Sequence, residues 1–167
     1  MVQWPRGCYH SYMRSSRAEI DLHGLTDGEL LDHVRALVAE QNRLAARLAA
    51  AVRAAETRQA CEHDGLKSMA SWLRSHSRLS GGAVSQLRRQ GRALAELPAL
   101  AEAFPAGAVT ADQVDVVAQI ATPENLDRAK EQDIDLPAIE AAVLGVATTR
   151  PYRDLQVAVG TYLAHLD

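Results

Sequence analysis

Residues 26–60 read TDGELLDHVRALVAEQNRLAARLAAAVRAAETRQA, and this stretch decides the fold class. Thr26 and Glu29 have the T-x-x-E spacing of a capping box, in which the two side chains accept hydrogen bonds from free amide groups at a helix start. No glycine or proline follows Glu29 as far as Ala60. The stretch therefore predicts one helix of at least about eight turns.

Side chains suited to a buried seam recur along this helix at alternating spacings of four and three residues, which places them in one line on its surface. The line consists of Leu30, Val34, Leu37, Gln41, Leu44, Leu48, Ala51 and Ala55. Such a line is typical of the spine of a helical bundle or of one half of a dimeric coiled coil. The polar Gln41 and the two small alanines favour the bundle, and a homodimer through residues 26–60 is the alternative.

The composition agrees with an all-helical chain. The 167 residues are 47% hydrophobic, but 30 residues are alanine and only 4% are aromatic. Alanine and leucine are the best helix formers, whereas strands favour β-branched and aromatic side chains. We therefore expect an all-α bundle of seven or eight helices, built on the long N-terminal helix. A flexible leader over residues 1–25 would precede one domain over residues 26–167.

Cysteine content and hydropathy indicate where the protein resides. Cys8 and Cys61 are the two cysteines, too few for a disulfide framework, which indicates a reducing compartment. The first residues lack the apolar stretch of a signal peptide, and no apolar run is long enough to span a membrane. We expect a cytoplasmic protein with no membrane association.

Charge is distributed unevenly along the chain. The net charge is −3, yet residues 65–95 hold six basic side chains and no acidic one, and residues 96–167 hold four basic and twelve acidic ones. A small net charge argues against a protein that coats nucleic acid over its whole surface, because such binding needs many phosphate contacts. It is compatible with one local basic face. A solvated helix face is the alternative interpretation.

Residues 69–92 read MASWLRSHSRLSGGAVSQLRRQGR, the order of a short helix, a tight turn and a longer helix. In a helix-turn-helix the second helix enters the major groove of DNA, where polar side chains near its start reach bases and phosphates. Gln86 and Arg89 are chemically suited to bases, and the serines and other basic side chains to phosphates. The predicted DNA-binding residues are Lys67, Arg74, Arg78, Ser80, Ser85, Gln86, Arg88, Arg89 and Arg92. A purely structural hairpin is the alternative.

The second helix of this segment has one polar stripe. At about 100° per residue, one side of this helix carries Ser85, Arg88, Arg89 and Arg92. Val84, Leu87 and Leu94 should point inward. Gly91 weakens the expectation that this helix protrudes as a reading helix. The opposite outcome is that the arginines form ion pairs with acidic residues of the 96–167 segment.

No catalytic motif is present in the sequence. The six histidines are scattered, and there is no H-E-x-x-H, phosphate-binding glycine loop or serine-nucleophile motif. Cys61 and His63 have the wrong spacing for a structural zinc site. The carboxylates of residues 124–140 alternate with Arg128 and Lys130, which predicts a solvated face rather than a metal site. We expect no catalytic residue, no metal and no cofactor; an enzyme whose site leaves no motif is the remaining alternative.

Several short motifs resemble the helical domain of unknown function at the front of many actinobacterial HNH-endonuclease-like proteins, among them the mycobacterial repeat family. The motifs are GLKS at 65–68, WL at 72–73, LS at 79–80, the run from Arg88 to LP at 97–98, FPAGAVTADQVDVVA at 104–118 and RPYRDL at 150–155. They span about residues 28–166 in order and spacing.

This resemblance implies that a nuclease module with a His-Asn-His metal finger usually follows such a domain. The chain contains no segment of that kind, so the nuclease activity is assigned to no residue here. The resemblance and the basic hairpin together predict a non-catalytic domain that recognises or positions DNA, as a truncated repeat copy or a stand-alone module. The alternative is a helical interaction module that dimerises and binds no nucleic acid.

Overall fold

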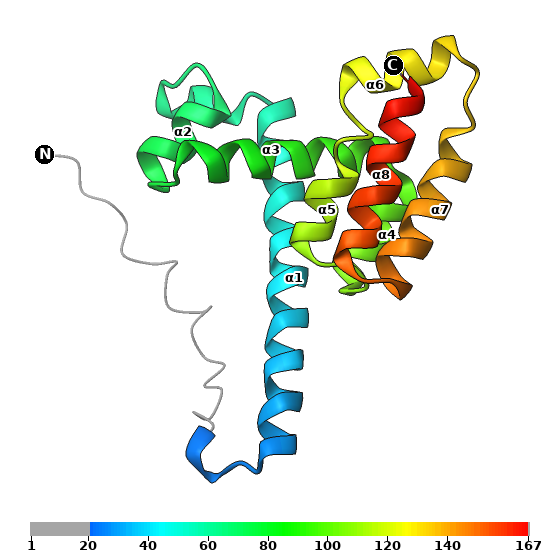
Figure 1. The fold of residues 1–167 in the computed structure, drawn as a ribbon. Helices are drawn as coiled ribbons and strands as arrows, with labels where there is room; N and C mark the ends of the chain where they lie inside the picture. Colours follow the sequence, from blue (N-terminus) through cyan, green and yellow to red (C-terminus); the bar gives the residue numbers. More distant parts are fainter. Residues whose placement is uncertain (1–20, 167) are drawn as a thin grey trace, which may run out of the picture. The chain divides into compact units, whose positions relative to one another are not determined.

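The computed structural model describes residues 21–166. Residues 1–20 of the leader expected over residues 1–25 lie outside this range. The described residues form eight α-helices and two short 3-10 helices and contain no strand, which confirms the predicted all-α class. The α-helices are α1 (Asp27–Thr57), α2 (Met69–His76), α3 (Gly81–Glu96), α4 (Pro98–Ala106), α5 (Ala111–Val117), α6 (Pro123–Glu131), α7 (Leu136–Thr149) and α8 (Tyr152–Leu166) (Figure 1).

The chain divides into two compact units, residues 1–36 and residues 37–167. The described part of the first unit holds the 3-10 helix η1 (Leu22–Gly24) and the start of α1. The rest of α1, the 3-10 helix η2 (Ala60–Asp64) and the later helices belong to the second unit.

The long helix that the sequence predicts is confirmed. Helix α1 is 31 residues long and runs without interruption. The capping box at its start is formed, because the Thr26 backbone N–H donates to Glu29 Oε2 at 2.9 Å and the Glu29 N–H donates to Thr26 Oγ1 at 3.4 Å. The helix ends before Gln59, which has a positive φ of 52° that ordinary helical backbone does not adopt.

The larger core of the second unit joins α4, α5, α7 and α8, of which α7 and α8 lie side by side (Figure 1). Its largest fully buried side chains are Phe104, Leu97, Leu100, Ile120, Leu155, Val109, Val114, Val117 and Val159. Full burial of one such side chain stabilises a fold by about 1.5–3 kcal/mol. This core therefore supplies most of the hydrophobic stabilisation of the unit.

A smaller core joins the end of α1 to η2, α2 and α3. Its buried side chains are Val52, Cys61, Met69, Leu73 and Val84. The Cys61 thiol is used for packing here, since the residue is 4% exposed, whereas His63 is exposed. This core anchors the short α2 to α3.

Helix α3 crosses α1 at Gly91. A Cβ atom on this buried glycine would lie 2.8 Å from the Ala49 carbonyl oxygen and 3.0 Å from Arg53 Cβ. Real Cβ atoms do not approach a backbone oxygen so closely, so the two helix backbones touch only because this residue is glycine. Gly91 is therefore a packing residue, which is why a helix of otherwise good formers tolerates it.

Glu140 corrects one expectation from the sequence. Its spacing predicts a place on a solvated acidic face, but it is 4% exposed, and its Oε1 accepts a hydrogen bond from the Leu100 backbone N–H at 2.8 Å. Helix α4 has no capping side chain of its own at Leu97. A carboxylate from α7 therefore satisfies a free amide at the start of α4 and lies favourably at its positive end. The other carboxylates of residues 124–135 are exposed, as expected.

We predict that Gly91→Ala lowers the free energy of unfolding by about 1–3 kcal/mol, because the new methyl group overpacks the crossing of α1 and α3. The matched control is Gly145→Ala in α7, where a Cβ meets nothing within 4 Å. There the higher helix propensity of alanine should stabilise the protein by up to about 1 kcal/mol. Urea unfolding followed by circular dichroism measures both. Equal effects of the two substitutions would contradict the packing role of Gly91.

We also predict an acid-sensitive start of α1. Hydrogen bonds from the Thr26 backbone N–H and hydroxyl hold the pKa of Glu29 below its ordinary value of 4.5. A carboxyl whose folded pKa is depressed stabilises the fold when ionised, so this contribution is complete above pH 4.5 and is lost as the pH falls through the folded pKa. Titration of the Glu29 carboxyl carbon by NMR tests the shift. In Glu29→Gln the start of α1 should lose its acid dependence, and an unchanged acid transition in this variant would assign it to another group.

Candidate nucleic-acid interface

Helices α2 and α3 form a hairpin with the layout of a helix-turn-helix. Four residues, 77–80, join them, which is the turn length typical of that motif. Ser68 and Ser80 are the N-caps, and each Oγ accepts a backbone N–H of the first turn at 3.2 Å. Ser80 is among the predicted DNA-binding residues, and its side-chain oxygen caps α3.

The hairpin is fixed from both sides. The Leu79 backbone N–H donates to the Leu73 carbonyl at 3.3 Å, and Trp72 Nε1 donates to Asp64 Oδ2 at 2.6 Å. Val84 is buried in the smaller core, and Leu87 packs against it. Leu94 packs against the larger core. The predicted inward direction of these three α3 side chains is confirmed.

The predicted DNA-binding residues differ in accessibility. Gln86, Arg88 and Arg92 are half-buried, whereas the exposed members are Lys67, Arg74, Arg78, Ser80, Ser85 and Arg89. Arg78 lies in the turn with a positive φ of 55°. The exposed set thus follows the loop before α2, α2 itself, the turn, and the outer face of α3.

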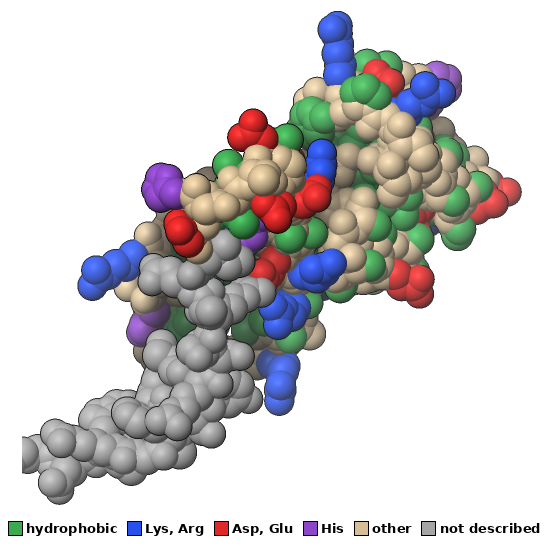
Figure 2. Space-filling model, turned by 90° about the horizontal axis from the view of Figure 1, so that it is seen from below, with side chains coloured by type: hydrophobic (Ala, Val, Ile, Leu, Met, Phe, Trp, Pro, Cys, Tyr) green, Lys and Arg blue, Asp and Glu red, His purple; other side chains and the backbone are tan. Residues whose placement is uncertain are grey.

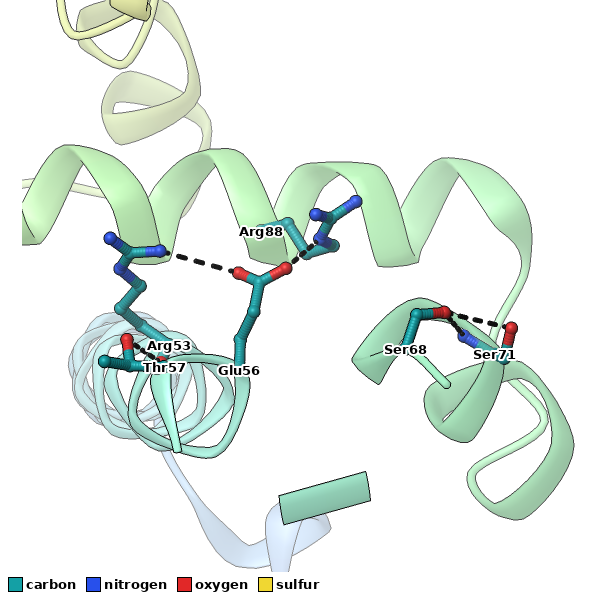
Figure 3. A network of polar contacts seen from close by, with 6 residues as sticks. All are labelled: Arg53, Glu56, Thr57, Ser68, Ser71 and Arg88. Carbon is teal, nitrogen blue, oxygen red and sulfur yellow. Dashed lines mark hydrogen bonds and ion pairs between the residues drawn. The ribbon is translucent and has the colours of Figure 1, made fainter. Parts of the chain in front are cut away.

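Glu56 from α1 engages an arginine of α3. Arg88 Nε donates to Glu56 Oε1 at 2.6 Å, and Arg53 Nη1 lies 3.7 Å from the other oxygen of the same carboxylate. Figure 3 shows Glu56 between the two guanidinium groups, beside the crossing of α1 and α3. The Arg88 side chain therefore has an acidic partner within the fold.

Asp115 from α5 engages the next arginine. Arg89 Nη2 lies 3.0 Å from Asp115 Oδ1 and 3.1 Å from Oδ2. The expected opposite outcome, ion pairing with the acidic 96–167 segment, is thus realised for Arg89. The acidic partner of Arg88 comes from α1 instead, and Arg92 forms no ion pair with a described residue.

These ion pairs are open to solvent. The side chains are 40% and 23% exposed in the Arg88–Glu56 pair and 45% and 30% exposed in the Arg89–Asp115 pair. Pairs with such exposure contribute about 0–1 kcal/mol. Exchange of a carboxylate for a phosphate would therefore cost little. Within the described residues, four of the six basic side chains of the 65–95 segment have no ion pair, namely Lys67, Arg74, Arg78 and Arg92.

The surface seen in Figure 2 carries charges of both signs. Basic and acidic side chains lie near one another on this face, so it is not a surface of one sign.

A separate apolar pocket of about 450 Å³ lies between α7 and α8. It is lined by Ile134, Ile139, Ala142, Val143, Val146, Ala158, Thr161, Tyr162 and His165. The Tyr162 hydroxyl is buried without a hydrogen-bond partner in the described chain, and burial raises the pKa of Tyr162.

No three His, Cys, Asp or Glu side chains within residues 21–166 are arranged to hold a metal ion. None of the described helices is long and apolar enough to cross a membrane.

The sequence did not reveal the acidic partners. The spacing of three residues between Arg53 and Glu56 predicts an ion pair within α1, but nothing in the spacing indicates a contact between Glu56 and Arg88. Asp115 is 26 residues from Arg89, and only the packing of α5 against α3 brings the two together. Long-range ion pairs of this kind depend on tertiary structure, so spacing along the chain does not predict them.

The family described as Domain of unknown function (DUF222) matches the chain over residues 31–160. The match begins inside α1 and ends inside α8, so it includes the α2–α3 hairpin and both cores. No curated protein and no solved structure matches the chain.

We predict a small coupling free energy between Glu56 and Arg88. A double-mutant cycle with Glu56→Gln and Arg88→Gln, measured by urea unfolding, should give about 0.2–1 kcal/mol, because both side chains remain partly solvated. The control cycle uses Asp127 and Lys130, whose atoms are 3.8 Å apart and whose side chains are 72% and 79% exposed; it should give a value near zero. A coupling well above the surface range would show that Arg88 is committed to α1.

Proposed function

The chain belongs to the DUF222 family, and we propose that it is a non-catalytic helical domain that binds or positions DNA through the α2–α3 hairpin. The observation that carries the proposal is the hairpin itself. A short helix, a four-residue turn and a capped longer helix stand in a segment with six basic and no acidic side chains. This combination supplies both the shape that fits a major groove and the charge that attracts phosphates.

The unpaired basic side chains supply the phosphate contacts in this proposal. Lys67, Arg74 and Arg78 are exposed and precede α3 along the chain. Contacts from such side chains to phosphates set the register and orientation of a protein on a duplex. The exposed outer face of α3, with Ser85 and Arg89, then lies where base edges are read.

The ion pairs of α3 make Arg88 and Arg89 secondary contributors. Each guanidinium has a carboxylate partner. Binding to a phosphate therefore gains only the difference in free energy between the guanidinium–phosphate and the guanidinium–carboxylate interactions. Since the pairs are solvent-exposed, that difference favours phosphate whenever DNA brings several phosphates to the hairpin at once. Glu56 and Asp115 then act as internal substitutes that hold the arginines in place without DNA.

The resemblance to the front domain of actinobacterial HNH-endonuclease-like proteins supports the same proposal. A nuclease module acts on DNA, and a neighbouring domain that holds the duplex would increase its effective concentration at the cleavage site. The proposal assigns cleavage to no residue of this chain. It includes a cytoplasmic location, because bacterial DNA is found there.

A second candidate function is a helical interaction module that binds no nucleic acid. The observation that favours it is a line of exposed apolar side chains on α1, including Leu37, Leu44 and Leu48. DNA binding at low salt separates the two functions, since only the first requires it.

We predict salt-dependent DNA binding that depends most on the unpaired arginines. Arg74→Ala with Arg78→Ala should weaken binding to duplex DNA and reduce the slope of log K against log salt by about two, one unit for each lost phosphate contact. Arg88→Ala with Arg89→Ala should also weaken binding, but by less, because each of these guanidinium groups must first leave a carboxylate. Fluorescence anisotropy over a range of salt concentrations measures both effects.

The matched control is Arg150→Ala with Arg153→Ala, which removes two exposed arginines near the start of α8. It should leave the salt slope unchanged. The proposal is wrong if the unmutated chain fails to bind DNA at low salt, or if the control weakens binding as much as the hairpin variants do.

A further inference from the structure

Helix α1 has a buried face and an exposed apolar face on opposite sides. One face consists of the buried residues Asn42, Ala46 and Ala49, which contact α3, the large core and the start of α5. At 100° per residue, Leu37 and Leu44 are about 180° around the helix from Ala46. The packing of the second unit therefore uses the small-residue face of α1 and leaves the face with large side chains uncovered.

We call this uncovered line in the second unit the leucine stripe; its members are Leu37, Gln41, Leu44 and Leu48. In the second unit Leu37, Leu44 and Leu48 are between 45% and 57% exposed, and in the first unit Leu30 and Val34 are 37% and 50% exposed. Val38, which flanks the stripe, is exposed as well. In the second unit Leu37, Val38, Leu44 and Leu48 together expose apolar area on the order of 300 Å², the size of the largest patches on typical monomers, which are often functional.

The spacing of the stripe selects a helix as its partner. Its members alternate at intervals of four and three residues, the a/d spacing of a heptad, and side chains at this spacing face a second helix that winds around the first. Leucine occupies one of the two core positions at Leu30, Leu37 and Leu44. The other core position holds Val34, Gln41 and Leu48. Leucine at the first position is a feature of two-stranded parallel coiled coils, and the β-branched residue that they favour at the second position is present only at Val34.

Gln41 makes a second copy of this chain the partner that fits best. In a parallel pair in register, Gln41 faces Gln41 of the second copy, and the two amides hydrogen-bond to each other. In an antiparallel pair it faces a leucine of the other core position, and its amide is buried without a partner, which costs free energy. The neighbouring positions on one side of the seam are Leu31, Val38 and Ala45, so no row of like charges opposes self-association.

We infer that the chain forms a parallel, two-fold symmetric homodimer in which the leucine stripes of two copies pack against each other. The inference rests on α1 alone and is independent of DNA binding by the α2–α3 hairpin.

The oligomeric state of the full chain tests the inference. Sedimentation equilibrium at micromolar concentrations should give twice the chain mass of 18.1 kDa. Leu44→Glu places a charge in the stripe and should raise the dissociation constant by about tenfold or more, equivalent to 1.4 kcal/mol. The matched control is Val157→Glu on α8, because Val157 is 61% exposed and Leu44 57%; it should leave the dissociation constant unchanged.

A gain of association excludes misfolding as the explanation. Gln41→Leu replaces the polar side chain of the seam and should tighten association by about tenfold or produce a higher oligomer, because a polar core residue lowers stability and restricts the oligomeric state. Helical content measured by circular dichroism should remain that of the unmutated chain.

Oxidative cross-linking tests the parallel alignment. In a Cys8→Ser background, Gln41→Cys should form an intermolecular disulfide readily, since the two new thiols face each other. Arg43→Cys, an exposed position outside the stripe, should not. A monomer throughout the micromolar range, or equal effects of the Leu44 and Val157 substitutions, would overturn the homodimer. A dimer in which Gln41→Cys cross-links no better than Arg43→Cys would overturn the parallel alignment.

Discussion

The contact between the backbones of α1 and α3 at Gly91 is the constraint on which the second unit depends. Because no Cβ separates Gly91 from the Ala49 carbonyl, side chains on either side of the crossing reach across it. Asn42 Oδ1 accepts the Ala111 backbone N–H at 3.0 Å, and Gln90 Nε2 donates to the Ala111 carbonyl at 3.1 Å. Two buried amides, one from each crossing helix, thus hold the start of α5. If α1 and α3 were farther apart, Ala111 could keep only one of these two hydrogen bonds.

The same crossing decides how far the arginines of α3 are available. With α1 this close, the Glu56 carboxylate lies within reach of Arg88, and the α5 that Asn42 and Gln90 position brings Asp115 to Arg89. Packing therefore pairs two basic side chains of the hairpin with carboxylates and leaves the others without an ion pair to a described residue. In α3 Arg88 and Arg89 have carboxylate partners but Arg92 has none among the described residues, and Arg74 of α2 and Arg78 of the turn face solvent without an acidic partner there. For this reason the experiments on α2 and the turn carry more weight for the DNA proposal than those on α3.

The sequence predicted the elements whose determinants are local. The capping box at Thr26 involves two residues three positions apart, and it forms as predicted. The roles that escaped prediction are those set by distant contacts. Glu140 looks like one of several surface acids until α7 brings it to the uncapped start of α4. Gly91 looks like a weakness in a helix until its neighbour across the crossing is known.

The line of apolar side chains on α1 depends on both local and distant determinants. Its spacing can be read from the sequence, but the face of α1 that packs against the protein is set by tertiary contacts. The sequence favoured this line as the spine of the bundle, and that prediction is wrong, because Leu37, Leu44 and Leu48 are exposed. The alanines of α1 face the body of the protein instead, since their small side chains permit the close crossing with α3. The leucines are then left for a surface outside the monomer. If two copies pair there, two α2–α3 hairpins become related by a two-fold axis, the arrangement with which dimeric helix-turn-helix proteins read paired half-sites. The phosphate contacts of one hairpin would then be doubled on a single duplex, which would strengthen binding.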